Sequence, residues 1–220
     1  MGIKVYADPI TVNCRKVIAG LNFIGAPYEL IHVDYFKGEH KAEPYLSLNP
    51  NASVPAMTDG DFELWESNAM LQYAADKFGN EAAYPRDLQT RSDINRWLQW
   101  EGSHWFPSCY VFLVENCVKP LLGGQPDPAV LDAQAAQFHK LAAILDKRLS
   151  SRRWVAGSDP HSGPTIADIV LAAPMHLHGW QKLPLSDHPS LKRWLLDGVE
   201  QLPCWQQTAV YEGFTTTRPN

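Results

Sequence analysis

Two short stretches, Val54-Pro55 and Glu66-Ser67, have the residue types and spacing to bind a ligand. Asp59-Gly60 between them predicts a tight hairpin turn, because both central positions of such a turn tolerate positive φ. The proline should begin a strand, where its peptide bond can be cis and would turn the valine backbone outward. The second stretch precedes apolar residues at helical spacing, and a helix N-terminus favours a carboxylate. These groups offer a place for a peptide-like acid, although a plain hairpin with a capped helix has the same spacing.

The remaining nucleophilic and metal-binding side chains are dispersed. The cysteines form no CxxC or metal-type pair, which argues against a disulfide framework and against structural zinc. They are Cys14, Cys109, Cys117 and Cys204. His176 and His178 would point to different sides of a helix, so they are not expected to bind a metal together. We predict reduced thiols and no metal.

Composition argues against several classes of partner. The 220 residues are 45% hydrophobic and 20% charged, as in a globular chain long enough for two domains. The net charge is -5 with 19 Lys and Arg, so we expect neither nucleic acid nor an anionic membrane as a partner. No signal-peptide core is found, and no apolar run approaches the roughly 18 residues of a membrane span. We expect a soluble, cytoplasmic protein.

The first third of the chain alternates short strands and helices. Strands are predicted at residues 3–6 and 28–34, with a helix between them that starts at Thr11 or Val12 and stops at Gly25. A polar loop and a short helix then lead to the hairpin and its helix; these segments are 35–41, 44–48, 54–65 and 66–78. The order β-α-β-α-β-β-α predicts a thioredoxin-like α/β layer of parallel strands closed by an antiparallel hairpin.

Beyond residue 88 the pattern is helical, and no convincing strand is found. Helices are expected at 89–117, 128–149, 165–180 and 189–201, with a loop at 119–128. Pro107 should kink the first helix, and Thr165 with Asp168 should form a capping box at the third. The predicted fold is therefore an α/β domain at 1–80, a linker at 81–88 and an all-helical domain at 89–220.

Several motifs appear in a specific order along these elements: SVPAM, ES eleven residues after its proline, DGDFELWESNA, and PTIADI in the helical half. With the domain order, they resemble the cytosolic glutathione transferase family across essentially the whole chain. The start of the first helix, Thr11-Val12-Asn13, is similar to the phi-type and bacterial nu-type members, in which Ser or Thr, one residue and Asn stand there. A VP or ES dipeptide alone would be almost no evidence for this family.

The resemblance implies a glutathione site. Thr11 matches the hydroxyl residue that hydrogen-bonds the glutathione thiol, and Asn13 matches a second polar group beside it. Val54 matches the residue whose backbone pairs with the cysteinyl part, and Pro55 the cis proline after it. Four further positions match polar residues around the two ends of glutathione: Glu66 and Ser67 at the γ-glutamyl end, and His40 and Lys41 at the glycyl carboxylate.

Two departures from the family pattern bear on this site. Thr11 replaces the commoner Ser, and Ser53 stands where Lys or Gln is frequent, so one contact to glutathione is expected to be weaker.

Without the resemblance, Thr11 would be interpreted as a helix cap. Cys14 could be a redox thiol as in cysteine-type relatives, but it has no partner cysteine and is better explained as core.

The resemblance implies a glutathione S-transferase that directs the thiolate at an apolar electrophile. A glutathione-dependent disulfide or peroxide reductase, and a non-catalytic ligand-binding relative, are the alternatives. The aromatic stretch 97–112 could supply the electrophile pocket, for which His104, Trp105 and Phe112 are candidates, although core packing explains at least half of its rings.

A symmetric homodimer is also predicted. The hairpin and its helix carry more apolar side chains than a domain of this size can bury: Phe62, Trp65, Met70, Tyr73 and Phe78. Self-association is a common way to cover such a surface. A monomer whose loop at 117–128 folds over the patch is the alternative.

Overall fold

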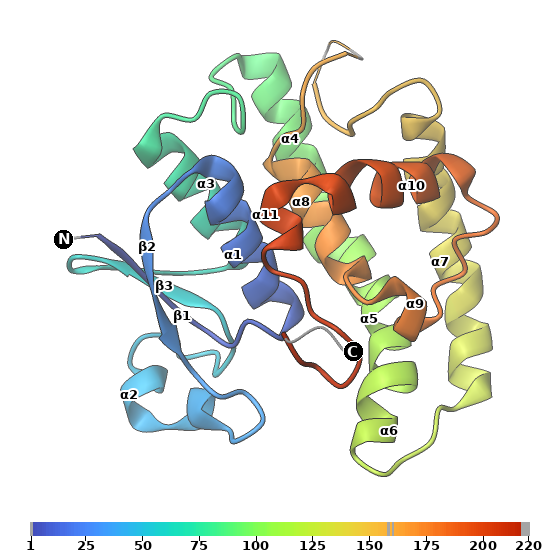
Figure 1. Cartoon of the computed structure of the whole chain (residues 1–220), viewed down its shortest axis with the longest axis horizontal. Helices are drawn as coiled ribbons and strands as arrows, with labels where there is room; N and C mark the ends of the chain where they lie inside the picture. The colour runs from blue at the N-terminus through green and yellow to red at the C-terminus, as the bar shows by residue number, and fades with distance from the viewer. Residues whose placement is uncertain (1, 158, 160, 217–220) are drawn as a thin grey trace.

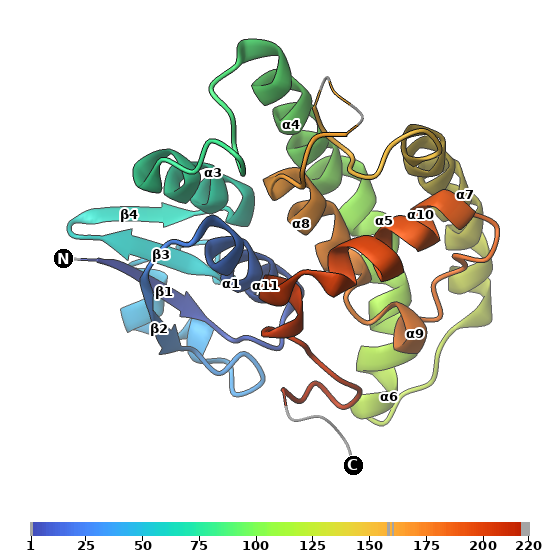
Figure 2. The same ribbon diagram turned by 45° about the horizontal axis from the view of Figure 1, so that its top comes forward.

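A computed structural model, which describes residues 2–157, 159 and 161–216, forms one sheet in the first third of the chain and a helical half after it (Figure 1). The strands are β1 (Ile3–Ala7), β2 (Tyr28–His32), β3 (Ala56–Asp59) and β4 (Phe62–Trp65). Their order is β2-β1-β3-β4, which Figure 2 shows from its lower to its upper edge. β1 and β2 are parallel and β3 and β4 form an antiparallel hairpin, as the sequence predicts. β3 also pairs antiparallel with β1, which the sequence analysis did not predict.

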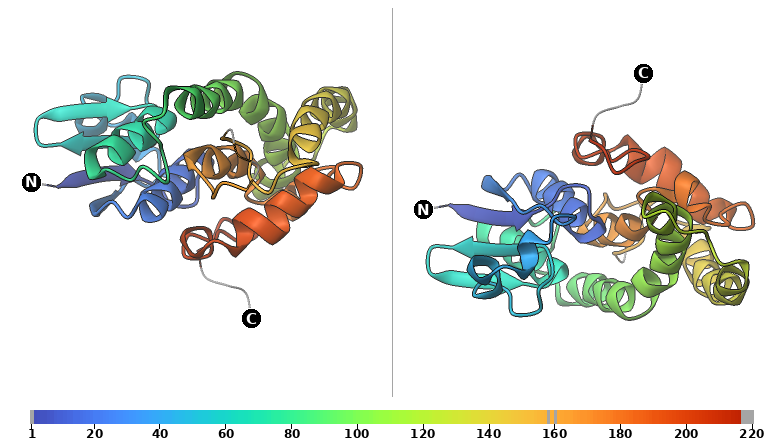
Figure 3. Two further views of the ribbon diagram at one scale, coloured as in Figure 1. Left: turned by 90° about the horizontal axis from the view of Figure 1, so that it is seen from above. Right: turned by 90° about the horizontal axis from the view of Figure 1, so that it is seen from below.

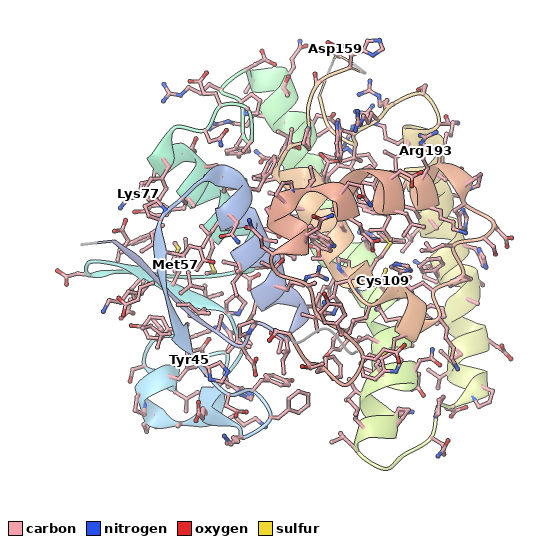
Figure 4. The ribbon with its side chains drawn as sticks, viewed as in Figure 1. Tyr45, Met57, Lys77, Cys109, Asp159 and Arg193 are labelled. Carbon is pink, nitrogen blue, oxygen red and sulfur yellow. The ribbon has the colours of Figure 1, made fainter. Side chains whose placement is uncertain are left out.

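Three helices accompany this sheet: α1 (Val12–Ile24), α2 (Glu43–Leu46) and α3 (Ser67–Phe78), and a 3-10 turn, Glu39–Lys41, precedes α2. Alternate residues of β1 belong to the main core that contains α1 and α3, whereas Tyr6 packs in a smaller cluster with Tyr45 of α2. Figure 4 shows Tyr45 at the α2 end of the sheet. The sheet thus has α1 and α3 on one face and α2 on the other.

Close contact between α1 and α3 depends on Gly20. A Cβ added there would lie 2.4 Å from Cδ2 of Leu71, so only glycine lets the two helices approach this far. Gly25 has φ 78°, and it ends α1 in the left-handed conformation that the sequence predicts for a C-terminal glycine.

The helical half is built from long and short segments. The helices are α4 (Leu88–Trp100), α5 (Phe106–Leu113), α6 (Lys119–Leu121), α7 (Pro128–Leu149), α8 (Ile166–Ala172), α9 (His178–Gln181), α10 (Pro189–Arg193) and α11 (Pro203–Gln206). Three π-helical segments, Glu101–Trp105, Val114–Val118 and Trp194–Gly198, directly follow α4, α5 and α10. Two 3-10 turns, Ala173–Met175 and Val199–Gln201, complete the half. α7 has the predicted bounds.

Proline explains most local differences from the prediction. A π-helical segment ends just before Phe106, and Pro107 lies in the first turn of α5. Pro107 has no N–H to donate, and the wider π-helical turn before it accommodates the missing hydrogen bond. Pro174 instead breaks the helix predicted at 165–180 into α8 and α9. The predicted loop at 119–128 begins later, because α6 continues to Leu121. In the hairpin, Asp59 pairs with Phe62, so the turn residues are 60 and 61, one position later than predicted.

The two halves meet along α1. Seen from above and below, they lie side by side with α1 and α8 at their boundary (Figure 3). Arg15 of α1 is buried, donates to the carbonyls of His176 and Trp205 at 3.2 Å each, and lies over the Trp205 ring.

We propose that the domain boundary falls within 79–87, after α3 and before α4. No helix in the described part of the chain has the length and apolar character needed to span a bilayer.

Candidate functional site

The strand register brings the predicted ligand residues to one end of the sheet. Ala56 pairs with Tyr6 on one side and with Trp65 on the other. The loop from β1 to α1, the Val54-Pro55 stretch before β3 and the first turn of α3 therefore lie next to one another. The Val54-Pro55 peptide bond is cis, as the sequence analysis allowed.

The loop before this bond is held by two side chains. The Tyr45 hydroxyl donates to the Ser53 carbonyl at 2.6 Å, and Asn49 Nδ2 donates to the same oxygen at 2.7 Å. Because the Ser53 carbonyl is satisfied inside the protein, the loop is fixed before any ligand arrives.

A cavity of about 670 Å³ opens between this end of the sheet and the helical half. Six predicted glutathione residues line it: Thr11, Asn13, His40, Lys41, Ser53 and Val54. The opposite wall is mostly apolar and comes from the helical half: Phe106, Tyr110, Leu113, Val118, Leu122 and Phe214. The first domain thus supplies the polar groups, together with Ile10, Val12, Tyr35, Phe36 and Ala52, and we call its side the polar wall; the helical half supplies the apolar wall that faces it.

Thr11 does not cap α1 with its side chain. It has the extended N-cap backbone, but its Oγ1 lies 3.1 Å from the Asp8 carbonyl and donates to it. The interpretation of Thr11 as only a side-chain cap therefore loses its geometric support. Oδ1 of Asn13, two residues on, is buried and has no hydrogen-bond partner among the described residues. An acceptor of this kind is open to a ligand.

His40 and Lys41 form part of the polar wall. The His40 ring is 5% exposed and stacks on Tyr35 with centroids 4.6 Å apart. Burial, and then the charge of Lys41, lower the pKa of His40 below its usual value, so the ring is neutral at pH 7. Lys41 is exposed and supplies the positive charge on this wall.

Pro55, Glu66 and Ser67 do not line the cavity; they lie beside it. Pro55 is buried beneath the loop, and Glu66 is exposed with φ 73°, which turns the chain from β4 into α3. The Glu66 side chain makes no capping hydrogen bond to α3. Ser67 is 8% exposed, and its Oγ accepts a hydrogen bond from Lys16.

The structure corrects the predicted apolar pocket. Trp105 is fully buried and donates to the Leu171 carbonyl, Phe112 packs against Phe138, and His104 is exposed, so none of the three candidates lines the cavity. The apolar side chains that do so from α5 are Phe106, Tyr110 and Leu113. Their spacing of four and three residues marks one face of a helix, a signal present in the sequence. Sequence alone did not show which face of this aromatic segment meets the first domain.

Cys14 is part of the core. It is fully buried, and burial raises the pKa of its thiol to about 12. A thiol with this pKa is not a nucleophile at neutral pH. The other three cysteines are also free and buried, and Figure 4 shows Cys109 inside the helical half.

Known proteins match this chain in sequence and in structure. Residues 1–76 match the family model Glutathione S-transferase, N-terminal domain, and residues 128–196 match Glutathione S-transferase, C-terminal domain. Glutathione S-transferase 3 of Zea mays is 34% identical over 161 residues, 71% of each chain. Glutathione S-transferase theta-1 of Homo sapiens is 33% identical over 198 residues, 88% of this chain and 81% of its own. Maize glutathione S-transferase I in complex with an atrazine glutathione conjugate superposes with a TM-score of 0.83 at 26% identity, over 95% of this chain and 97% of that one.

A thioredoxin-like sheet that carries a polar wall, joined to a helical half that carries an apolar wall, defines the class of protein. The chain belongs to the glutathione S-transferase family. This confirms the predicted fold and the predicted transferase activity. The roles of individual site residues stay predictions.

Proposed function

We propose that this chain conjugates the glutathione thiolate to an apolar electrophile, and that Thr11 stabilises the thiolate. The observation that carries the proposal is that Thr11 lines a cavity whose opposite side is apolar. The assignment as a phi-like or nu-like, threonine-type member and the cytoplasmic location belong to the same proposal. They rest on the resemblance of the first helix start and on composition.

Thr11 would have to exchange hydrogen-bond partners when glutathione binds. Its hydroxyl donates to the neutral Asp8 carbonyl, and rotation about Cβ–Oγ1 would direct it to a thiolate instead. A hydrogen bond to an ion contributes about 1.5–3 kcal/mol, against roughly 1 kcal/mol for a neutral pair. The exchange therefore favours the thiolate by about 1–2 kcal/mol, which equals about one pKa unit.

The helix start adds to this effect. α1 has no acidic residue in its first turn, so its N-terminal dipole favours an anion beside Thr11. The buried Asp8 carboxylate before the helix opposes this in part, although it already accepts from the Ile10 and Tyr35 amides. A free thiol with a pKa near 8.5 is only about 3% ionised at pH 7, and lowering that pKa by roughly two units increases the thiolate about 25-fold. Thr11 needs no proton-transfer role for this gain.

The rest of glutathione would extend along the polar wall. We place its cysteinyl backbone on Val54 and its glycyl carboxylate near His40 and Lys41, which line the same cavity. Its γ-glutamyl end would reach Glu66 and Ser67, which adjoin the cavity through the β3–β4 register. Glu66 would accept from the ligand ammonium and Ser67 would donate to the carboxylate.

Substitution of Thr11 tests the proposal. Thr11→Ala should lower kcat/KM with a generic aryl halide about tenfold near pH 7, since one pKa unit of thiolate stabilisation is a factor of ten. Thr11→Ser keeps the hydroxyl and is the matched control, with activity expected within about threefold of the original chain. Equal activity of the alanine and serine variants at pH 7 would contradict the role of Thr11.

We also propose a symmetric homodimer. Phe62 and Trp65 lie on the edge strand β4 and are 47% and 39% exposed, and Phe78 at the end of α3 is 36% exposed. Met70 does not contribute, contrary to the prediction, because it is fully buried in the core with α1. An exposed apolar edge strand is a surface on which a second copy can pack.

Sedimentation equilibrium tests the dimer. The chain should show twice its 24.7 kDa mass, and Trp65→Glu should shift it toward a single chain. Leu30→Glu is a matched control, because Leu30 is 40% exposed on β2 at the opposite edge of the sheet, and it should leave the mass unchanged. A single-chain mass for the unmodified protein would exclude the dimer.

A further inference from the structure

A buried ion pair lies directly behind the first turn of α3. Lys16 of α1 and Glu101, which follows α4, have side chains only 2% and 1% exposed, and Lys16 Nζ lies 2.9 Å from Glu101 Oε1. Two charges are rarely buried together unless further polar groups satisfy them. Here those groups come from α3.

Ser67 and Asn68 complete the network. Lys16 Nζ donates to Ser67 Oγ and to Asn68 Oδ1, each at 3.2 Å. Asn68 Nδ2 donates to Glu101 Oε2 at 3.1 Å and to the Leu98 carbonyl at 2.9 Å. The network therefore ties the start of α3 to α1 on one side and to α4 on the other.

The charged members fix the hydrogen-bond roles of the neutral ones. An ammonium can only donate and a carboxylate can only accept, so the orientation of the Asn68 amide is determined. Ser67 Oγ must accept from Lys16, and this leaves the Ser67 hydroxyl proton to point elsewhere. Within the described residues that proton has no acceptor, although Ser67 is only 8% exposed.

We propose that Lys16 and Glu101 are positioning residues that orient the Ser67 hydroxyl, so that its proton points away from the Lys16 ammonium and toward a ligand carboxylate at the N-terminus of α3. The inference rests on the proposed function, in which the γ-glutamyl carboxylate of glutathione occupies this place. It adds a reason for the orientation of Ser67: the Lys16 ammonium occupies one lone pair of the Ser67 oxygen and repels the hydroxyl proton, which leaves that proton for the ligand. Glu101 balances the charge of Lys16 and aligns Asn68.

Binding measurements on the full chain can isolate this effect. Glutathione and the analogue γ-aminobutyryl-cysteinylglycine, which lacks the γ-glutamyl α-carboxylate, would be titrated by calorimetry into four proteins. These are the original chain, Ser67→Ala, the charge-neutral pair Lys16→Met with Glu101→Gln, and the triple variant. The pair replaces both charges, because removal of one alone would leave the other buried and unpaired.

Ser67→Ala should weaken glutathione binding about tenfold, as expected when a hydrogen bond to a charged group is lost. The Lys16/Glu101 variant should lose a similar factor, and the triple variant should bind no more weakly than Ser67→Ala, because all three changes remove one interaction. The analogue should bind all four proteins alike. A structural role alone would weaken both ligands equally.

The proposed carboxylate site and the proposed positioning role fail in different ways. If Ser67→Ala leaves glutathione affinity unchanged, the carboxylate site is wrong, and the positioning role is overturned with it. If Ser67→Ala weakens binding but the Lys16/Glu101 variant does not, or if the losses add in the triple variant, only the positioning role is overturned.

Lys16→Gln combined with Glu101→Gln, which again removes both charges, serves as a second variant if the first folds poorly. It keeps a polar neutral side chain, but its donor is about 1.5 Å shorter in reach, which takes it out of hydrogen-bond range of Ser67. It should lose the same factor for glutathione and nothing for the analogue. Retained glutathione affinity in a folded protein with Lys16→Gln and Glu101→Gln would overturn the positioning role.

Discussion

Asp168 should stabilise this protein more than its place in a capping box suggests. The box is present as predicted: Thr165 Oγ1 accepts from the Ala167 amide at 3.2 Å, and Asp168 Oδ2 accepts from the Thr165 amide at 2.9 Å. The other carboxylate oxygen accepts from the Val155 amide and from Trp194 Nε1, each at 2.9 Å. Asp168 therefore joins the loop after α7 and the last helices to the start of α8.

The magnitude follows from the groups left unsatisfied. Asp168→Ala would leave three buried N–H donors without an acceptor, at roughly 1–3 kcal/mol each. Since single substitutions seldom exceed about 5 kcal/mol, we expect the free energy of unfolding to fall by about 3–5 kcal/mol. From the capping box alone, about 1 kcal/mol would be expected.

Urea unfolding at pH 7 measures this difference, with Thr165→Val as the matched control. The control loses the cap to Ala167 but keeps the three N–H bonds of Asp168, so it should lose only about 1 kcal/mol. Equal losses in the two variants would show that the bonds to Val155 and Trp194 contribute nothing to stability.

Two further predictions concern buried titratable groups. Burial, and then the charge of Arg15, hold the pKa of His176 well below its usual value, so the unfolded chain binds a proton that the folded chain does not. Stability should be full above about pH 6.5 and fall as the pH drops, and His176→Leu should reduce that slope by up to about 1.4 kcal/mol per pH unit in urea unfolding; an unchanged slope would contradict this. Cys14→Ala should keep full turnover and lose roughly 1 kcal/mol of stability. A large loss of turnover in folded Cys14→Ala protein would show that Cys14 takes part in the reaction.

Local signals predicted much of the fold. The hairpin, α3 and the glycine stop of α1 follow from turn residues and helical spacing that act over a few positions. α7 was predicted with its observed bounds, because Pro128 starts it and its apolar spacing is regular. The π-helical segments were missed, since an extra residue in a helical turn leaves no mark on an apolar pattern.

In the candidate site, the sequence motifs pointed to the polar wall but not to the correct residues of the apolar wall. The polar wall was located through short motifs whose residues meet because the strand register is fixed. The apolar wall was assigned to the wrong side chains, because the face of α5 that meets the cavity depends on the π-helical turn before it. Lys16 gave no signal at all: it is separated from Glu101 by most of the first domain, and only the folded structure brings the two together.

The ionisation of glutathione in the complex tests the central claim most directly. Ultraviolet absorbance of the thiolate, followed against pH, gives the pKa of the bound thiol in the original chain, in Thr11→Ala and in Thr11→Ser. That pKa should lie below about 8.5 in the original chain and in the serine variant, and about one unit higher in the alanine variant. The same bound pKa in all three proteins would contradict the claim that Thr11 stabilises the thiolate.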